Sequence, residues 1–185
     1  AVLIPDSSTG VNDLILEQKG LLELRLWKKG KSAHGAHPLL GKNAVELLWE
    51  DYEQIKKLFE KDKNKEWGMT LNLGRFNGGY NDNQVPDWAE MHLDMRFVEE
   101  KQLNRVLKSI HELTNNVQVL LKSPPFKQSE KDAYIRMFMK SVQRFTKHVP
   151  TLIREQGASD ARFFSHYRIT AIVTGVKKGE IHSEG

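Results

Sequence analysis

The sequence predicts an α/β protein in which a β-α-β-β-α-β unit is inserted into a domain built on a parallel sheet. Two observations carry this prediction. Short apolar runs at residues 2–4 and 169–173 are typical of strands buried in a parallel sheet. Between them, residues 20–124 alternate between strand and helix periodicity. We therefore expect a discontinuous domain, residues 1–19 and 125–185, around an inserted domain, residues 20–124.

The strands expected in the inserted domain alternate apolar and polar residues. In residues 21–28, leucines alternate with charged and aromatic residues. The segments at 69–74, 89–97 and 117–121 repeat this alternation. Because successive side chains of a strand point to opposite faces, each strand has one apolar face, as expected of a half-exposed sheet.

Two segments with helical spacing lie between these strands. Asn43 precedes the first and is a suitable N-cap. An antiparallel sheet backed on one face by two helices, the ferredoxin-like arrangement, satisfies this order of elements. The apolar positions are Ala44, Leu48, Tyr52, Ile55 and Phe59 in the first helix, and Leu103, Val106, Leu107, Ile110 and Leu113 in the second.

The discontinuous domain, residues 1–19 and 125–185, has a different pattern of predicted elements. Residues 132–146 have helical periodicity, 151–154 form a short extended segment, and a further helix begins within 157–164. Together with the apolar runs near the two ends of the chain, these segments indicate parallel α/β structure.

The composition excludes several kinds of site. The 185 residues include no cysteine, so disulfides, thiolate nucleophiles and cysteine-based zinc sites are ruled out. The 28 Lys and Arg are interleaved with 24 Asp and Glu, which gives little reason to expect nucleic acid. The first residues form neither a signal peptide nor a membrane span. We expect no nucleic-acid or membrane partner and a cytoplasmic location.

Two ionisable residues closely follow the apolar runs. Asp6 comes after residues 2–4, and His182 comes after residues 169–173 and a glycine-bearing loop. If both runs are strands of one sheet, these side chains converge beyond the strand ends, where α/β proteins bind ligands. Imidazole and carboxylate together suit zinc. The alternative is that Asp6 caps a turn and that His182 belongs to a flexible chain end.

A loop of small residues leads into the helix expected near residue 160. Ser159 or Asp160 could cap this helix, and the amides that follow Gly157 could hold an anion. Arg154 lies just upstream and is suited to bidentate capture of a carboxylate. Helix capping and a surface arginine remain the simpler interpretation of these residues.

His34 lies in a loop before Pro38, where an imidazole can polarise a carbonyl or stabilise an oxyanion. The spacing to His37 suggests a metal pair, but Gly-Ala between the two and the proline after them oppose the helix that would align both rings. By themselves, Asn83 reads as a turn residue and Arg96 as a polar strand residue.

Four stretches, in order, carry a resemblance to a known family. They are Gly-Lys-Ser-Ala-His-Gly-Ala-His-Pro at 30–38 with Gly-Lys-Asn-Ala at 41–44; Gly-Gly at 78–79 with Asn-Gln-Val-Pro-Asp at 83–87 and Asp-Met-Arg at 94–96; Gly-Ala-Ser-Asp-Ala-Arg-Phe at 157–163; and Ile-His-Ser-Glu at 181–184. The chain resembles the zinc-dependent aminoacylase and exopeptidase family that includes succinyl-diaminopimelate desuccinylase, acetylornithine deacetylase, glutamate carboxypeptidase and the carnosinase-related dipeptidases.

The resemblance implies a metallohydrolase in which a lid domain, which also dimerises, interrupts the catalytic domain. It implies that His34 contacts the scissile carbonyl, in several members from the opposite subunit. It also implies that the full-length enzyme binds one or two zinc ions, and that its substrate is a small N-acyl amino acid or peptide. The other implied roles are substrate contacts at Asn83, Arg96, Arg154, Gly157, Ser159 and Asp160, and metal ligands at Asp6 and His182.

One departure from the family pattern limits what these residues can do alone. The family also uses a His-x-Asp motif, a bridging Asp and a Glu-Glu pair that contains the general base. No His-x-Asp precedes the lid here, and the only Glu-Glu pair, Glu99-Glu100, lies inside it. We therefore expect the C-terminal portion of a longer enzyme, inactive by itself. The alternative is a non-catalytic dimerisation or ligand-binding module.

Overall fold

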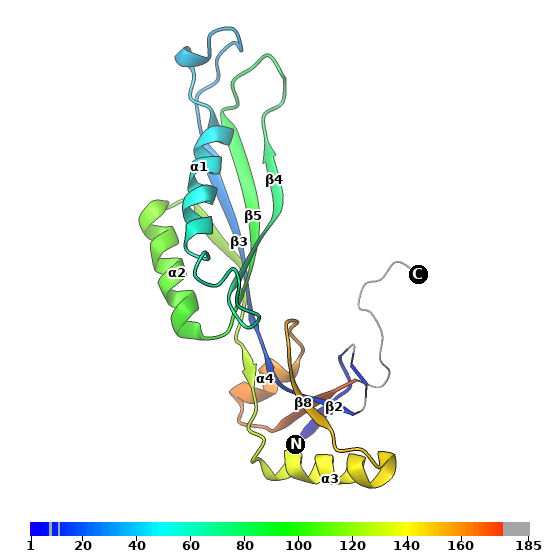
Figure 1. The fold of residues 1–185 in the computed structure, drawn as a ribbon. Helices are drawn as coiled ribbons and strands as arrows, with labels where there is room; N and C mark the ends of the chain where they lie inside the picture. Colours follow the sequence, from blue (N-terminus) through cyan, green and yellow to red (C-terminus); the bar gives the residue numbers. More distant parts are fainter. Residues whose placement is uncertain (8, 11, 176–185) are drawn as a thin grey trace. The chain divides into compact units, whose positions relative to one another are not determined.

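The computed structural model describes residues 1–7, 9–10 and 12–175. These residues form two compact units, which are treated separately (Figure 1). Unit 1 comprises Ala1–Gly20 and Pro124–Gly185, and unit 2 comprises Leu21–Ser123. The mixed α/β fold class expected from the sequence is confirmed. None of the helices in the described part of the chain is long and apolar enough to cross a membrane.

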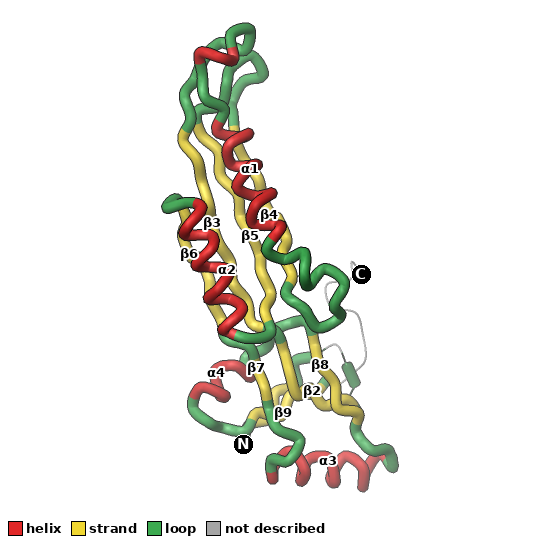
Figure 2. Tube along the Cα trace, turned by 60° about the vertical axis from the view of Figure 1, so that its left-hand side comes forward, coloured by secondary structure: helices red, strands yellow, loops and turns green. Residues whose placement is uncertain are grey.

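Unit 2 has the β-α-β-β-α-β order expected from the sequence. Its strands form a four-stranded sheet in the order β4-β5-β3-β6, and both helices lie on the same face of that sheet (Figure 2). The ferredoxin-like prediction is therefore confirmed. The elements are β3 (Gly20–Lys29), α1 (Ala44–Lys57), β4 (Thr70–Gly78), β5 (Trp88–Phe97), α2 (Glu100–Leu113) and β6 (Val117–Ser123).

Strand alternation builds the core of unit 2. Leu22, Leu24 and Leu26 of β3 are fully buried, while the residues between them are half-buried. Strand β5 repeats this pattern along its whole length. The buried faces of both strands pack against α1 and α2 in one apolar cluster. One non-apolar residue, Asp51, lies on the buried stripe of α1.

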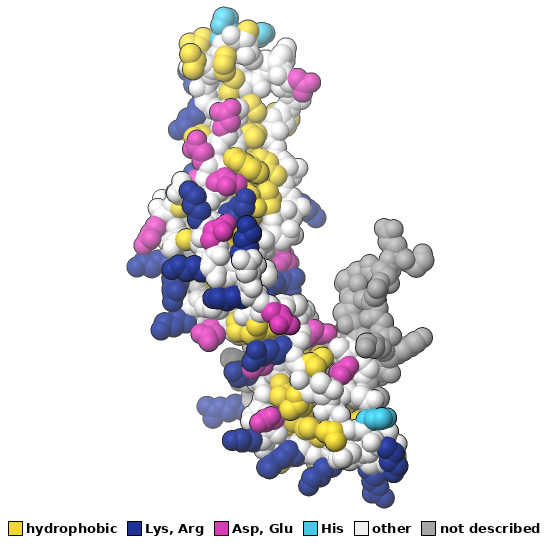
Figure 3. Space-filling model, in the orientation of Figure 1, with side chains coloured by type: hydrophobic (Ala, Val, Ile, Leu, Met, Phe, Trp, Pro, Cys, Tyr) yellow, Lys and Arg dark blue, Asp and Glu magenta, His cyan; other side chains and the backbone are white. Residues whose placement is uncertain are grey.

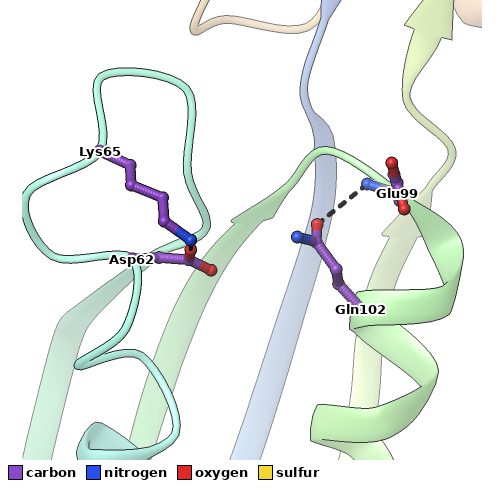
Figure 4. Close-up of polar contacts among 4 residues, drawn as sticks. All are labelled: Asp62, Lys65, Glu99 and Gln102. Atoms are coloured by element: carbon purple, nitrogen blue, oxygen red, sulfur yellow. Dashed lines mark hydrogen bonds and ion pairs between the residues drawn. The ribbon is translucent and has the colours of Figure 1, made fainter.

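Local hydrogen bonds fix where the helices of unit 2 begin. The Asn43 Oδ1 accepts from the backbone amides of Val45 and Glu46 at 3.0 and 3.4 Å, so the N-cap prediction is confirmed. At the start of α2, the amide of Glu99 donates to the Gln102 side chain at 3.2 Å (Figure 4). The turns after α1 carry an ion pair between Lys65 Nζ and Asp62 Oδ1 at 2.6 Å, also drawn in Figure 4.

Unit 1 contains a sheet of five short strands in which parallel and antiparallel pairs coexist. Strand β1 pairs in parallel with β9, and β2 pairs in parallel with β8. Strand β2 runs antiparallel to β9 and to β7, a two-residue strand that the sequence pattern did not reveal. The elements are β1 (Val2–Ile4), β2 (Asp13–Gln18), β7 (Phe126–Lys127), α3 (Ala133–Thr146), β8 (Thr151–Glu155), α4 (Ala161–His166) and β9 (Ala171–Thr174).

The two helices of unit 1 pack on opposite faces of this sheet. Leu14 of β2 belongs to a cluster with Ile135 of α3, whereas its neighbour Ile15 belongs to a cluster with Ala161 of α4. Successive strand residues point to opposite faces, so the two clusters lie on the two sides of the sheet. Burial on both faces was also expected for residues 2–4, but Leu3 is 55% exposed. Val2 and Ile4 pack in the α4 cluster, whereas Leu3 points to the other face and is not part of the α3 cluster.

Candidate functional site

The first part of the candidate site is one end of unit 2, where two connections meet. The segment between β3 and α1 carries His34, and the segment between β4 and β5 carries Asn83. The amide of Gly35 donates to the carbonyl of Asn83 at 2.7 Å, and the amide of Val85 donates to the carbonyl of Ala33 at 2.8 Å. The structure thus brings together His34 and Asn83, which lie far apart in the sequence.

A glycine avoids crowding where these segments cross. A Cβ atom at Gly35 would lie 3.0 Å from both the carbonyl carbon and the carbonyl oxygen of Asn83, which leaves almost no room for a side chain. The backbone bonds and this close approach hold both segments while the side chains of His34 and Asn83 stay exposed. Both side chains are therefore presented to solvent on a fixed backbone.

The His34 side chain has a defined hydrogen-bonding state. Its Nδ1 accepts a hydrogen bond from the amide of Ala36 at 3.1 Å. A neutral imidazole that accepts at Nδ1 carries its proton on Nε2, which can therefore donate. The His37 ring lies 6.3 Å from the His34 ring, centroid to centroid, and is tilted by 50°. Among the described residues, no group of three His, Asp or Glu side chains could hold a metal ion.

Arg96 lies at the other end of unit 2. It pairs with Thr70 across β4 and β5, whereas Ala89, near the His34 end, pairs with Gly78. The seven residue steps from Ala89 to Arg96 at about 3.3 Å each give about 23 Å. The Arg96 Nε and Nη2 donate to the Asp94 carboxylate at 2.8 and 2.9 Å. Within one chain, Arg96 is therefore not brought to His34.

The predicted metal ligands are only partly described. Asp6 is exposed and follows β1, whose pairing with β9 confirms the parallel strands expected at the two ends of the chain. His182 lies outside the described residues. Since the described residues supply only Asp6 of the predicted pair, they do not form a metal site on their own.

Arg154 lies near the end of β8. Its side chain is 57% exposed, and its Nε lies 3.2 Å from Glu17 Oε2 on the neighbouring strand β2. Lys127 Nζ lies 3.3 Å from the other oxygen of Glu17. Glu17 thus orients the Arg154 guanidinium, and the exposed part of that side chain remains accessible to a carboxylate.

The loop at 157–160 joins a hydrogen-bonded network. Ser159 is 4% exposed, and its backbone amide and Oγ donate to Gln18 Oε1 at 3.2 and 2.6 Å. Gln18 Nε2 donates to Glu155 Oε2 at 2.6 Å, and Ser7 Oγ donates to Glu155 Oε1 at 2.8 Å. Gly157 and Asp160 are exposed. The network connects the neighbour of Asp6, the neighbour of Arg154 and the predicted substrate loop.

Sequence reasoning missed Gln18, Glu155 and Ser7 in this network. A weak signal existed for Gln18, because it is a polar residue at the end of an apolar strand. The hydrogen bonds themselves join residues more than a hundred positions apart and leave no local pattern. Asp160 is the N-cap residue of α4, but its side chain makes no capping hydrogen bond. The Ser159 Oγ accepts from the amide of Ala161, the first residue of the helix, at 3.3 Å.

Comparison with known proteins supports the resemblance seen in the motifs. A family model described as peptidase dimerisation domain matches residues 16–120. Succinyl-diaminopimelate desuccinylase of Wolinella succinogenes is 25% identical over 193 residues, covering 97% of this chain and 51% of that protein. Acetylornithine deacetylase of Vibrio cholerae serotype O1 is 30% identical over 112 residues, covering 56% of this chain and 29% of that protein.

Solved structures show the same fold. Aminopeptidase PepT from Bacillus cereus superposes with a TM-score of 0.79 at 20% identity, covering 98% of this chain and 50% of that chain. The chain thus spans about half the length of the desuccinylase and of the aminopeptidase. Since the family model matches more than half of its residues, the chain belongs to the peptidase dimerisation domain family.

Proposed function

We propose that this chain is part of a zinc-dependent hydrolase that cleaves an amide or peptide bond next to a free carboxylate. The relatives named desuccinylase, deacetylase and carboxypeptidase support this reaction class. The observation that carries the proposal is His34, whose imidazole is held by the Ala36 amide with Nε2 as the donor. The substrate is a small N-acyl amino acid or peptide.

His34 stabilises the charge that develops on the scissile carbonyl oxygen. As water adds to the carbonyl, this oxygen becomes negative, and a fixed N–H donor lowers the energy of that state more than the energy of the bound substrate. The backbone bonds of Gly35 and Val85 fix the segment that carries the ring. Asn83, beside it, contacts the same substrate through its exposed amide.

The arginines recognise the substrate carboxylate. Arg96 uses one edge of its guanidinium on Asp94, which leaves Nη1 and the second Nη2 proton for a ligand. Arg154 is oriented by the contact of its Nε with Glu17 Oε2 at 3.2 Å. Because Arg96 lies about 23 Å along β5 from Ala89, near the end of unit 2 that carries His34, a substrate that touches both His34 and Arg96 takes them from two copies of the chain. This separation supports a homodimer formed through unit 2.

A surface suited to such a dimer lies on α1 and β4. Trp49 is 48% exposed, and its ring lies 5.3 Å from that of Tyr52 and 6.1 Å from that of Phe76. Figure 3 shows hydrophobic side chains gathered over these elements. Strand β4 is also an edge of its sheet, and an edge strand offers unpaired backbone groups to a second copy. A non-catalytic dimerisation module is the competing function for the same surface.

Most of the proposed zinc site is supplied by residues that the 185-residue sequence does not contain. Asp6 and His182 are two of the proposed ligands, and each binds a different ion if the site holds two. A bound zinc would supply an activated water and polarise the scissile carbonyl. The sequence contains neither a His-x-Asp before the lid nor a Glu-Glu pair outside it. We therefore expect the 185 residues alone to be inactive and the complete protein to be active.

Turnover by variants of His34 tests this function. In the complete protein with added zinc, N-succinyl and N-acetyl amino acids and tripeptides serve as substrates. We expect His34→Ala to lower kcat about 10²- to 10³-fold, as loss of one oxyanion donor does. His34→Gln, which keeps an N–H donor, should lose less. His37→Ala is the matched control, since His37 is exposed in the same segment, and it should retain turnover.

Two results would contradict the proposal. If the wild-type protein cleaves none of these substrates, the chain serves a non-catalytic function. If His34→Ala and His37→Ala retain equal turnover, hydrolysis stands but His34 has no part in it.

A further inference from the structure

The network around Gln18 has features of a device that positions other residues. Gln18 is 2% exposed, and its side-chain amide makes one hydrogen bond as donor and two as acceptor. A buried amide with all these partners in place has only one orientation that satisfies them. Gln18 therefore restricts the positions of Glu155 and Ser159, and of the segments to which they belong.

Those partners belong to separate parts of unit 1. Ser159 belongs to the 157–160 loop, and Glu155 directly follows Arg154 at the end of β8. The Glu155 carboxylate also accepts from Ser7, the residue after Asp6. Of the predicted ligand and substrate residues that the structure describes, the Gln18 side chain forms hydrogen bonds to Ser159 only. Its influence on Asp6, Arg154 and Gly157 passes through these neighbours.

We propose that Gln18 is a positioning residue that holds the 157–160 loop and Arg154 in the arrangement in which they contact substrate. The proposal rests on the proposed function, because it takes these segments as substrate contacts. Glu155 is the second member of the device, since its two oxygens join Gln18 to Ser7. Gln18 and Glu155 are also paired across β2 and β8, and their side chains extend this pairing to Ser7 and to the 157–160 loop.

Exchanging the two side chains separates this role from ordinary packing. Gln18→Glu places a carboxylate against the Glu155 carboxylate, at a position where donor and acceptor are now 2.6 Å apart, and the like charges repel. In the double variant Gln18→Glu/Glu155→Gln, the new amide at 155 donates to the new carboxylate at 18. Its carbonyl oxygen still accepts from Ser7, and the carboxylate still accepts from Ser159. The exchange keeps every hydrogen bond and the net charge.

Steady-state kinetics of the complete protein give the first readout. We expect Gln18→Glu to lower kcat/KM about 10- to 100-fold, as misplaced supporting residues do, mainly through KM. The exchanged double variant should recover to within about threefold of wild type, inside the usual scatter of such effects. The control is Thr170→Val, which removes the hydrogen bond from Thr170 Oγ1 to Asp132 at 2.9 Å elsewhere in unit 1. It should leave KM unchanged.

Amide hydrogen exchange gives a readout that needs no substrate. The amides of the 157–161 segment should exchange faster in Gln18→Glu and return to wild-type rates in the double variant, since the like charges in the single variant loosen the bond from the Ser159 amide to residue 18. If the wild-type protein has no hydrolase activity, the proposed function fails, and this exchange pattern alone decides whether the network holds the loop.

The proposal is overturned by either of two outcomes. The first is a loss of kcat/KM in Gln18→Glu that equals the loss in Thr170→Val, because the effect is then one of general stability. The second is failure of the double variant to restore either KM or the exchange rates, because the pairing of residues 18 and 155 is then not what positions the loop.

Discussion

An ion pair in unit 2 should control how firmly α1 is held on the sheet. Lys28 Nζ of β3 lies 2.8 Å from Asp51 Oδ2 of α1, and the two side chains are 22% and 8% exposed. Lys28 is at the end of β3 and Asp51 is inside α1, so the pair anchors both ends of the connection that carries His34.

The burial of each partner sets the order of the expected losses. Removing one member of a buried pair costs about 3–5 kcal/mol of unfolding free energy, since the other charge is left without compensation. Asp51→Asn leaves the more exposed Lys28, whose long side chain can reach water, so we expect about 3 kcal/mol. Lys28→Met leaves the nearly buried carboxylate, so we expect about 4 kcal/mol. Lys28→Met/Asp51→Leu should lie within about 1 kcal/mol of wild type.

Urea unfolding followed by tryptophan fluorescence measures these losses. All 4 tryptophans of the chain lie in unit 2, so the signal reports that unit. With a slope of about 1.5 kcal/mol per M, a loss of 3 kcal/mol lowers the midpoint by about 2 M. The reasoning is refuted if the double variant is less stable than both single variants, or if Asp51→Asn costs more than Lys28→Met.

Two further predictions concern unit 1 and the dimer. Burial raises the pKa of the Asp132 carboxyl, but hydrogen bonds from Thr170 and from the first amides of α3 outweigh this and bring the pKa below its ordinary value. Asp132→Ala should therefore lower the free energy of unfolding by about 1 kcal/mol at pH 7. In urea titrations this difference between wild type and variant should fade below about pH 4, because the wild-type carboxyl becomes protonated there. A difference that stays constant down to about pH 2 contradicts this. Trp49→Lys should weaken self-association at least about tenfold in sedimentation velocity, while Leu120→Lys on the other edge strand should not, and the reverse result would place the dimer on β6.

Local periodicity explains why most of the fold could be predicted. The strands and helices of unit 2 bury one face, and burial of one face imposes a period of two or 3.6 on the sequence. The residues that broke this rule were missed. Asp51 lies on the buried stripe of α1, where the pattern favours apolar side chains, because Lys28 of another element supplies its partner. No periodicity of α1 alone contains that information.

The candidate site was predictable to a different extent in the two units. His34 and Asn83 were both selected from motifs, but their proximity depends on backbone hydrogen bonds between two connections. The network of Gln18, Glu155 and Ser7 was not foreseen, since a polar residue near a strand end is common and its distant partners are not encoded nearby. Motifs identify chemically able residues, whereas hydrogen bonds over long sequence separations arrange them.

The predicted substrate residues of the 157–160 loop differ in how many of their polar atoms already form hydrogen bonds within the protein. The Ser159 hydroxyl donates its single proton to Gln18 and accepts from the Ala161 amide, so one lone pair is left for a ligand. Gly157 and Asp160 flank it and are exposed. A ligand that approaches the loop therefore meets the backbone at Gly157 and the carboxylate of Asp160 before it meets Ser159. We expect Ser159→Ala to act through the position of the loop, and Asp160→Asn to act on substrate affinity directly.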